Sequence, residues 1–137
     1  QMTRYAKAFG MKVIGVDKET PGITTLLTQS DIVTVHIPLA GNEGFFTKEM
    51  FGKMKKTALF INTSRTDVVE RGALLHALKN KLIAGAATDF MDDIRLVDYE
   101  DTHDNLILTN HVGGFTAEDR LLTDEFILNR MKNAIRL

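Results

Sequence analysis

The chain has 137 residues, and its 17 basic and 18 acidic residues give a formal net charge of −1 at pH 7, with no cysteine. This length fits one compact domain over residues 1–137. The charge balance lacks the basic excess of a nucleic-acid-binding domain. No apolar run approaches the ~20 residues that cross a bilayer, and the opening residues show no secretory signal. With no disulfide or thiolate metal site to form, we expect a cytoplasmic protein that binds neither nucleic acid nor a membrane.

Short apolar runs alternate with helical patterns along the chain. In chain order, we predict a helix over 2–9, a strand over 11–16, a helix over 23–29, a strand over 32–37, a helix over 48–54, a strand over 58–62, a helix over 71–80, strands over 83–88 and 106–109, and a long helix over 117–135. The strands are continuous and rich in Val, Ile, Leu or Ala, which is typical of parallel strands covered on both faces. The alternation predicts an α/β fold with a doubly wound parallel sheet.

One stretch, residues 89–104, is strongly acidic. It holds Asp89, Asp92, Asp93, Asp98, Glu100, Asp101 and Asp104 against a single arginine. The stretch has two interpretations, a carboxylate metal site or a solvated acidic loop. Because the spacing matches no calcium-binding loop, the loop is favoured and we expect no metal.

Polar residues follow each predicted strand, at the edge where open α/β sheets bind ligands. They are Asp17, His36 with Pro38, residues 62–65, Asp89 and residues 110–114. Each has an ordinary alternative: Asp17 and Asp89 as turn caps, His36 as a structural histidine, Arg65 in a surface salt bridge and His111 as a helix-capping loop residue. Their coincidence at five strand ends favours one shared binding site.

Five segments carry a resemblance to a known family. They are AKAFGMKVIGVD, LLTQSDIVTVHIPLA, MKKTALFINTSRTDVVERGALLHAL, LIAGAATDF and NLILTNHVGGFTAE, in this order and over nearly the whole chain. They resemble the NAD-binding domain of the D-isomer-specific 2-hydroxyacid dehydrogenases, such as phosphoglycerate dehydrogenase and hydroxypyruvate reductase. The resemblance implies a Rossmann-like fold, NAD as cofactor, and hydride transfer between NAD(H) and a small 2-hydroxy or 2-oxo acid.

The resemblance also implies roles for single residues. Those assigned to cofactor binding are Asp17, His36, Pro38, Thr63, Arg65, Asp89, His111 and Gly114. Asp17 corresponds to the carboxylate on the adenosine ribose, which disfavours NADP, and Asp89 to the residue that holds the nicotinamide carboxamide. Arg65 corresponds to the catalytic arginine that grips the substrate carboxylate. His111 corresponds to the histidine that exchanges a proton with the substrate oxygen.

The chain departs from the family pattern at several positions. The glycine-rich phosphate loop and its strand would stand before Gln1, so we expect a sheet that is incomplete there. Ile94 occupies the place of the glutamate that partners the catalytic histidine, and Asp93 is one residue early. Thr66 replaces a glycine after the arginine, and Asn110 replaces a proline before the histidine.

Two consequences follow for the molecule. The stretch between residues 17 and 30 is short, and no segment supplies the substrate domain of the family. A sheet that lacks its central first strand must close the gap by direct pairing or borrow a partner, so we expect a homodimer formed through the C-terminal helix or the sheet edge.

Two other interpretations of the function stay open: a non-catalytic, nucleotide-sensitive interaction module, and a truncated gene product without activity of its own.

Overall fold

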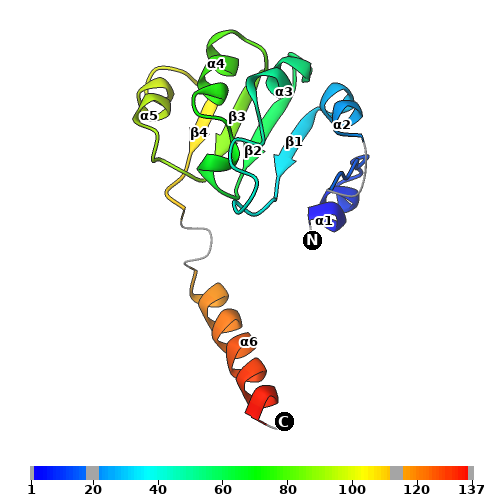
Figure 1. Cartoon of the computed structure of the whole chain (residues 1–137), viewed down its shortest axis with the longest axis vertical. Helices are drawn as coiled ribbons and strands as arrows, with labels where there is room; N and C mark the ends of the chain where they lie inside the picture. Colours follow the sequence, from blue (N-terminus) through cyan, green and yellow to red (C-terminus); the bar gives the residue numbers. More distant parts are fainter. Residues whose placement is uncertain (1, 18–21, 112–115, 136–137) are drawn as a thin grey trace.

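The core of the protein is a four-stranded parallel sheet. The computed structural model describes residues 2–17, 22–111 and 116–135. The strands are β1 (Ile32–Val35), β2 (Leu59–Asn62), β3 (Gly85–Thr88) and β4 (Leu106–Leu108), and they pair in the order β1-β2-β3-β4 (Figure 1). This arrangement confirms the predicted α/β fold, since each strand is parallel to the next and the connections carry helices.

Helices flank the sheet and extend beyond it. They are α1 (Met2–Ala8), α2 (Ile23–Gln29), α3 (Lys48–Lys53), the short 3-10 helix η1 (Thr66–Val68), α4 (Ala73–Lys79), α5 (Ile94–Glu100) and α6 (Ala117–Ile135). The five predicted helices are confirmed to within two residues at each end. No helix in these described ranges combines the length and apolar character that a membrane span requires.

The predicted strand over residues 11–16 is wrong. These residues form no strand in the structure, and the four-stranded sheet pairs with none of them. The physical reason is that a strand is defined by its partner, and its backbone groups stay unpaired when no neighbour is in reach. The expected closing of the sheet by direct pairing therefore does not occur among the described residues.

The acidic stretch is also not simply a loop, because it contains α5. Asp93 stands just before this helix, and its carboxylate accepts a hydrogen bond from the Arg95 backbone N–H at 3.1 Å. A capping carboxylate of this kind satisfies an amide that the helix itself leaves unpaired. The side chain of Tyr99 then anchors the helix, since it is buried and its hydroxyl donates to Asn105 Oδ1 at 3.1 Å.

Three aromatic rings form the centre of the core. Phe46, Phe51 and Phe60 are each at most 2% exposed, and their ring centroids lie 4.7 to 4.9 Å apart. Phe60 comes from β2, Phe51 from α3 and Phe46 from the loop before α3. The cluster fixes α3 against the sheet, and edge-to-face aromatic pairs of this kind add about 0.5–1.5 kcal/mol beyond their buried area.

Helix α6 stands away from the sheet (Figure 1). Its large apolar residues are 49% to 70% exposed to solvent, with Leu121 at 70% and Leu122 at 65%. The predicted helix is thus confirmed, but its apolar side chains do not cover this sheet.

Candidate functional site

The carboxyl ends of the strands form a common rim. Asn62 at the end of β2 lies beside Thr88 at the end of β3, and Thr88 lies beside Leu108 at the end of β4. The loops that carry Arg65, Asp89 and His111 leave the sheet from this row. The predicted gathering of strand ends is therefore confirmed for these three strands.

Asn62 organises the loop that carries Arg65. Its side chain is 1% exposed, and its Oδ1 accepts hydrogen bonds from Ser64 N and Ser64 Oγ, both at 3.0 Å. Its Nδ2 donates to the Arg65 carbonyl oxygen at 2.9 Å. The amide thus closes a tight turn that ties the backbone of Arg65 to the end of β2. Sequence reasoning missed this role, although a polar residue closing an apolar strand was a usable signal.

The Arg65 side chain is exposed at the rim. Its Nη1 donates to the Ser64 carbonyl oxygen at 2.6 Å. Within the described ranges it forms no ion pair with a carboxylate. The salt-bridge interpretation of Arg65 is therefore not what this structure shows, and most of the guanidinium donors are available to a ligand.

His111 is held against Asp89. The His111 backbone N–H donates to Asp89 Oδ1 at 3.1 Å, and Thr109 Oγ1 donates a short hydrogen bond to the same oxygen. The ring Nδ1 of His111 lies 3.3 Å from the Asp89 carbonyl oxygen and 3.7 Å from Asp89 Oδ2. The imidazole also stacks on Phe90, with ring centroids 5.3 Å apart. Asp89, which directly follows β3, therefore contacts both the backbone and the ring of His111, which follows β4.

The backbone of His111 adopts an unusual conformation, with φ at 55°. A non-glycine residue in this left-handed region is strained, and such strain is concentrated at functional sites. The side chain of His111 is 51% exposed, while that of Asp89 is 18% exposed. A shielded carboxylate thus holds an accessible imidazole in place.

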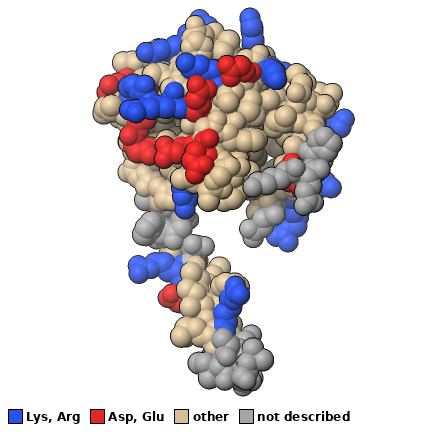
Figure 2. Space-filling model, viewed as in Figure 1, with Lys and Arg blue, Asp and Glu red and all other residues tan. Residues whose placement is uncertain are grey.

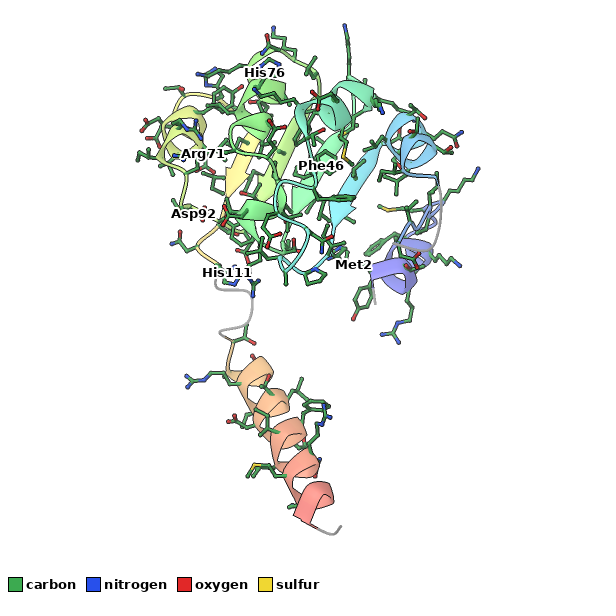
Figure 3. All side chains as sticks on the ribbon, in the orientation of Figure 1. Met2, Phe46, Arg71, His76, Asp92 and His111 are labelled. Atoms are coloured by element: carbon green, nitrogen blue, oxygen red, sulfur yellow. The ribbon has the colours of Figure 1, made fainter. Side chains whose placement is uncertain are left out.

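Asp93 does not serve as a substitute partner for His111. Its carboxylate binds the Arg95 side chain through Nε at 2.9 Å and Nη2 at 2.7 Å. These hydrogen bonds from Arg95 keep the pKa of Asp93 below its ordinary value of 3.8. Asp92 accepts a hydrogen bond from Thr66 Oγ1 at 2.9 Å, and Ile94 is 66% exposed. Asp92 and His111 lie toward the same end of the sheet (Figure 3).

The remaining predicted residues are spread more widely. Asp17 is exposed at the end of the stretch 11–17, which forms neither helix nor strand, and Thr63 is exposed after β2. His36, also exposed, is paired through Nε2 with Thr34 Oγ1 at 2.9 Å. The Pro38 carbonyl oxygen accepts a hydrogen bond from Asn42 Nδ2 at 2.8 Å. Gly114 lies outside the described residues.

A hollow of about 420 Å³ opens beside the rim, between η1 and the start of α5. Its lining includes Thr66, Arg71, Thr88, Phe90 and Asp92, but neither Arg65 nor His111. Figure 2 shows acidic and basic side chains crowded together on this side of the molecule. Within the described ranges, no three His, Cys, Asp or Glu side chains are grouped closely enough to hold a metal ion.

Comparisons with known proteins agree with this geometry. Residues 1–113 match the family model described as "D-isomer specific 2-hydroxyacid dehydrogenase, NAD binding domain". Glycerate dehydrogenase of Methylorubrum extorquens is 37% identical over an alignment that covers 93% of this chain and 44% of that protein. D-3-phosphoglycerate dehydrogenase of Bacillus subtilis is 36% identical, over 88% of this chain and 26% of that protein.

Solved structures give the same result. An acyclic imino acid reductase in complex with NADPH and D-Arg superposes with a TM-score of 0.84 at 29% identity, covering 97% of this chain and 46% of that one. D-lactate dehydrogenase from Escherichia coli superposes with a TM-score of 0.81 at 26% identity, covering 98% of this chain and 47% of that one. The chain spans less than half the length of each of these relatives. By sequence and by fold, the chain belongs to the D-isomer specific 2-hydroxyacid dehydrogenases and corresponds to their NAD-binding domain.

Proposed function

We propose that this domain binds NAD(H) across the rim of the sheet and contributes Arg65 and His111 to the interconversion of a small 2-oxo acid and its 2-hydroxy acid. The observation that carries the proposal is the register of β2, β3 and β4. It brings the loops of Arg65, Asp89 and His111 to one edge, where open α/β sheets bind nucleotides.

Arg65 would bind the carboxylate of the acid. Its guanidinium is exposed and, within the described ranges, its only hydrogen bond is to the neighbouring Ser64 carbonyl oxygen. A guanidinium can donate two parallel hydrogen bonds to a carboxylate, which fixes the orientation of the acid as well as its position. Lysine lacks this planar fork and would not orient the acid in the same way.

His111 would exchange the proton. NADH, when bound, would supply the hydride for reduction of the 2-oxo acid. The His111 imidazolium gives a proton to the carbonyl oxygen, and the neutral imidazole takes the hydroxyl proton in the reverse direction. The ring is accessible and its orientation is fixed by Phe90 and Asp89, which suits a group that must meet a reacting oxygen.

The nicotinamide end of the cofactor fits the residues present. Asp89 and Thr63 follow β3 and β2 at the rim, and we assign them to this end. His36 and Pro38 follow β1 and would lie under the dinucleotide. Asp17 would contact the adenosine ribose, and Gly114 would also contact the cofactor. The preference for NAD over NADP rests on the carboxylate of Asp17.

We further propose a homodimer in the cytoplasm. The support for the dimer is the apolar surface of α6, whose exposed leucines gain from burial against a partner. The same surface favours a second candidate function, a nucleotide-sensitive interaction module that associates with another protein without catalysis.

The test compares two site variants with two matched controls. Arg65→Ala and His111→Ala remove the proposed groups. Arg71→Ala and His76→Ala remove an arginine beside the hollow and a histidine on α4 (Figure 3). We measure NADH binding by fluorescence, and NADH oxidation with glyoxylate, hydroxypyruvate and pyruvate.

We expect NADH to bind to the folded chain and to the two controls. Where turnover is measured, we expect His111→Ala to lose about 10²–10⁴-fold, the usual contribution of a general acid or base. Failure of the folded chain to bind NADH would contradict the proposal. NADH binding without turnover, together with a partner whose affinity depends on NADH, would favour the interaction module.

A further inference from the structure

The family places a glutamate beside its catalytic histidine, and Ile94 stands at that place in this chain. The structure points to a different partner. We propose that Asp89 is the positioning residue for His111 and is the carboxylate partner of its ring in place of that glutamate. The inference rests on the proposed function for its catalytic meaning, but the contact itself does not depend on any ligand.

The first argument concerns the ring nitrogens of His111. Nδ1 lies 3.3 Å from the Asp89 carbonyl oxygen, and a carbonyl oxygen only accepts hydrogen bonds. The hydrogen of the neutral imidazole is therefore assigned to Nδ1, which leaves the lone pair on Nε2. The hydrogen bond on one ring nitrogen sets the role of the other, so Nε2 is the atom that faces the substrate oxygen.

The second argument concerns charge. Asp89 Oδ2 lies 3.7 Å from Nδ1, close enough to act as the counter-charge when the imidazole takes up a second proton. Oδ1 is occupied by two hydrogen bonds, from the His111 N–H and the Thr109 hydroxyl. A carboxylate has about four acceptor sites, so Oδ2 serves the imidazole and retains capacity for a cofactor amide.

The third argument concerns the backbone. His111 has a φ of 55°, a conformation that the surroundings must enforce. The hydrogen bond from its N–H to Asp89 Oδ1 provides that restraint at 3.1 Å. One aspartate therefore fixes the backbone, the ring orientation and the tautomer of His111.

The neighbouring carboxylates are engaged elsewhere. Asp93 caps α5 and binds Arg95, and Asp92 accepts from Thr66. Among the described residues, Asp89 is the one carboxylate paired with the His111 ring. Asp92 is therefore a suitable control, since it lies in the same loop and on the same side of the sheet.

The experiment reads the ring nitrogens of His111 directly by ¹⁵N NMR on the full chain without NAD or substrate. In the wild type and in Asp92→Asn, we expect the Nδ1–H tautomer to predominate at a pH where the ring is neutral. Asp89→Ala keeps the backbone carbonyl oxygen but removes the Oδ1 hydrogen bond that holds the His111 backbone and the Oδ2 carboxylate beside Nδ1. We therefore expect the ring to leave that carbonyl oxygen and to show the tautomer mixture of an unrestrained histidine. His36, His76 and His103 provide internal references whose signals should not change.

Asp89→Asn guards against misfolding of the alanine variant, because its amide oxygen can still accept from the His111 N–H. We expect it to keep the fold and to weaken the Nδ1–H preference. A His111 ring spectrum identical to the wild type in either folded variant would overturn the proposal. Since no ligand is present, that result would count against Asp89 alone, whereas failure of the proposed function appears in the NADH-binding assay.

Discussion

Asn62 shows how one buried amide shapes the candidate site through the turn that it closes. It offers one acceptor oxygen and one amide nitrogen, and the structure uses both to close the turn before Arg65. Its backbone oxygen also accepts from Asp89 N at 3.0 Å, which links the loops after β2 and β3. The position of Arg65 relative to Asp89 therefore depends on a residue between them in space.

Asn62→Ala is expected to destabilise the protein. The change removes the acceptor of Ser64 N and one of the two donors to the Arg65 carbonyl oxygen, which also accepts from Val68 N at 3.4 Å. An unpaired amide in a shielded turn costs about 1–3 kcal/mol. Asn110→Ala is the control, since Asn110 is exposed and follows β4 on the same rim. Urea unfolding monitored by circular dichroism measures both. Equal unfolding free energies for the two variants would show that the Asn62 amide contributes nothing.

The carboxylate of Asp93 makes the stability of α5 depend on pH. The pKa of Asp93 is lowered in the folded state by its hydrogen bonds from Arg95, whereas the unfolded chain has the ordinary value of 3.8. A group with a lowered folded pKa stabilises the protein above its unfolded pKa, and that contribution is lost as the pH falls through the folded pKa.

We therefore expect Asp93→Asn to be less stable than the wild type at neutral pH, and the difference in unfolding free energy to shrink as the pH falls below 3.8. Unfolding curves of both proteins across this range make the comparison. A difference that stays constant with pH would mean that the carboxylate acts through its shape and not through its charge.

At Gly85, β3 lies too close to its neighbours for a side chain. A Cβ atom at Gly85 would lie 2.9 Å from the Asn105 backbone oxygen and 3.4 Å from Leu59 Cδ2. Backbone cannot give way as a flexible side chain can, so the glycine is required for the approach of β4. Gly52 in α3 differs, because a Cβ atom there would meet nothing within 4 Å and its φ is ordinary.

The two glycines predict opposite outcomes for the same substitution. Gly85→Ala should lower the free energy of unfolding by about 1–3 kcal/mol through overpacking. Gly52→Ala should raise it by about 0.5–1 kcal/mol, since alanine is the better helix former. Thermal unfolding of both variants decides the matter. A neutral Gly85→Ala would show that β4 can shift away from β3.

The strands and most helices could be predicted because their signals are local. The apolar runs that became β1 to β4 and the periodic stretch that became α4 carry their structure in their own residues. Residues 11–16 have an equally strong strand pattern, yet a pattern cannot supply a partner strand. Helix α5 could not be predicted because the charges of this stretch indicate a loop. The helix forms because Asp93 caps its first turn and Tyr99 is buried against the core.

For the candidate site, too, one part could be predicted from the sequence and another could not. Arg65, Asp89 and His111 could be placed at one rim from strand ends and motifs, and the register brings their loops together. The contact between Asp89 and the His111 ring could not be predicted. It depends on the left-handed backbone of His111 and on a distance across two strands, and neither is encoded in local spacing.

The exposed apolar surface of α6 predicts self-association of the chain. If α6 is the dimer contact, Leu121→Glu or Phe126→Glu should convert a dimer to a monomer, because a buried charge at the contact is costly. Thr123→Glu is the control for Leu121→Glu, because residues two positions apart lie on different faces of a helix. Light scattering after size exclusion measures the mass against the 15.3 kDa chain. A well-folded wild-type monomer at that mass would contradict the proposal.

The order of the strands has a consequence for the sequence in which parts of the protein unfold on warming. β2 and β3 are each flanked by a strand on both sides, whereas β4 lies at one border of the sheet. Local fraying begins at such borders and needs less free energy than global unfolding. Arg65 follows β2 and His111 follows β4, so gentle warming should disorder the loop of His111 before the loop of Arg65. Under the proposed function, turnover would then be lost before binding of the acid, and unfolding of β2 and β3 would come last.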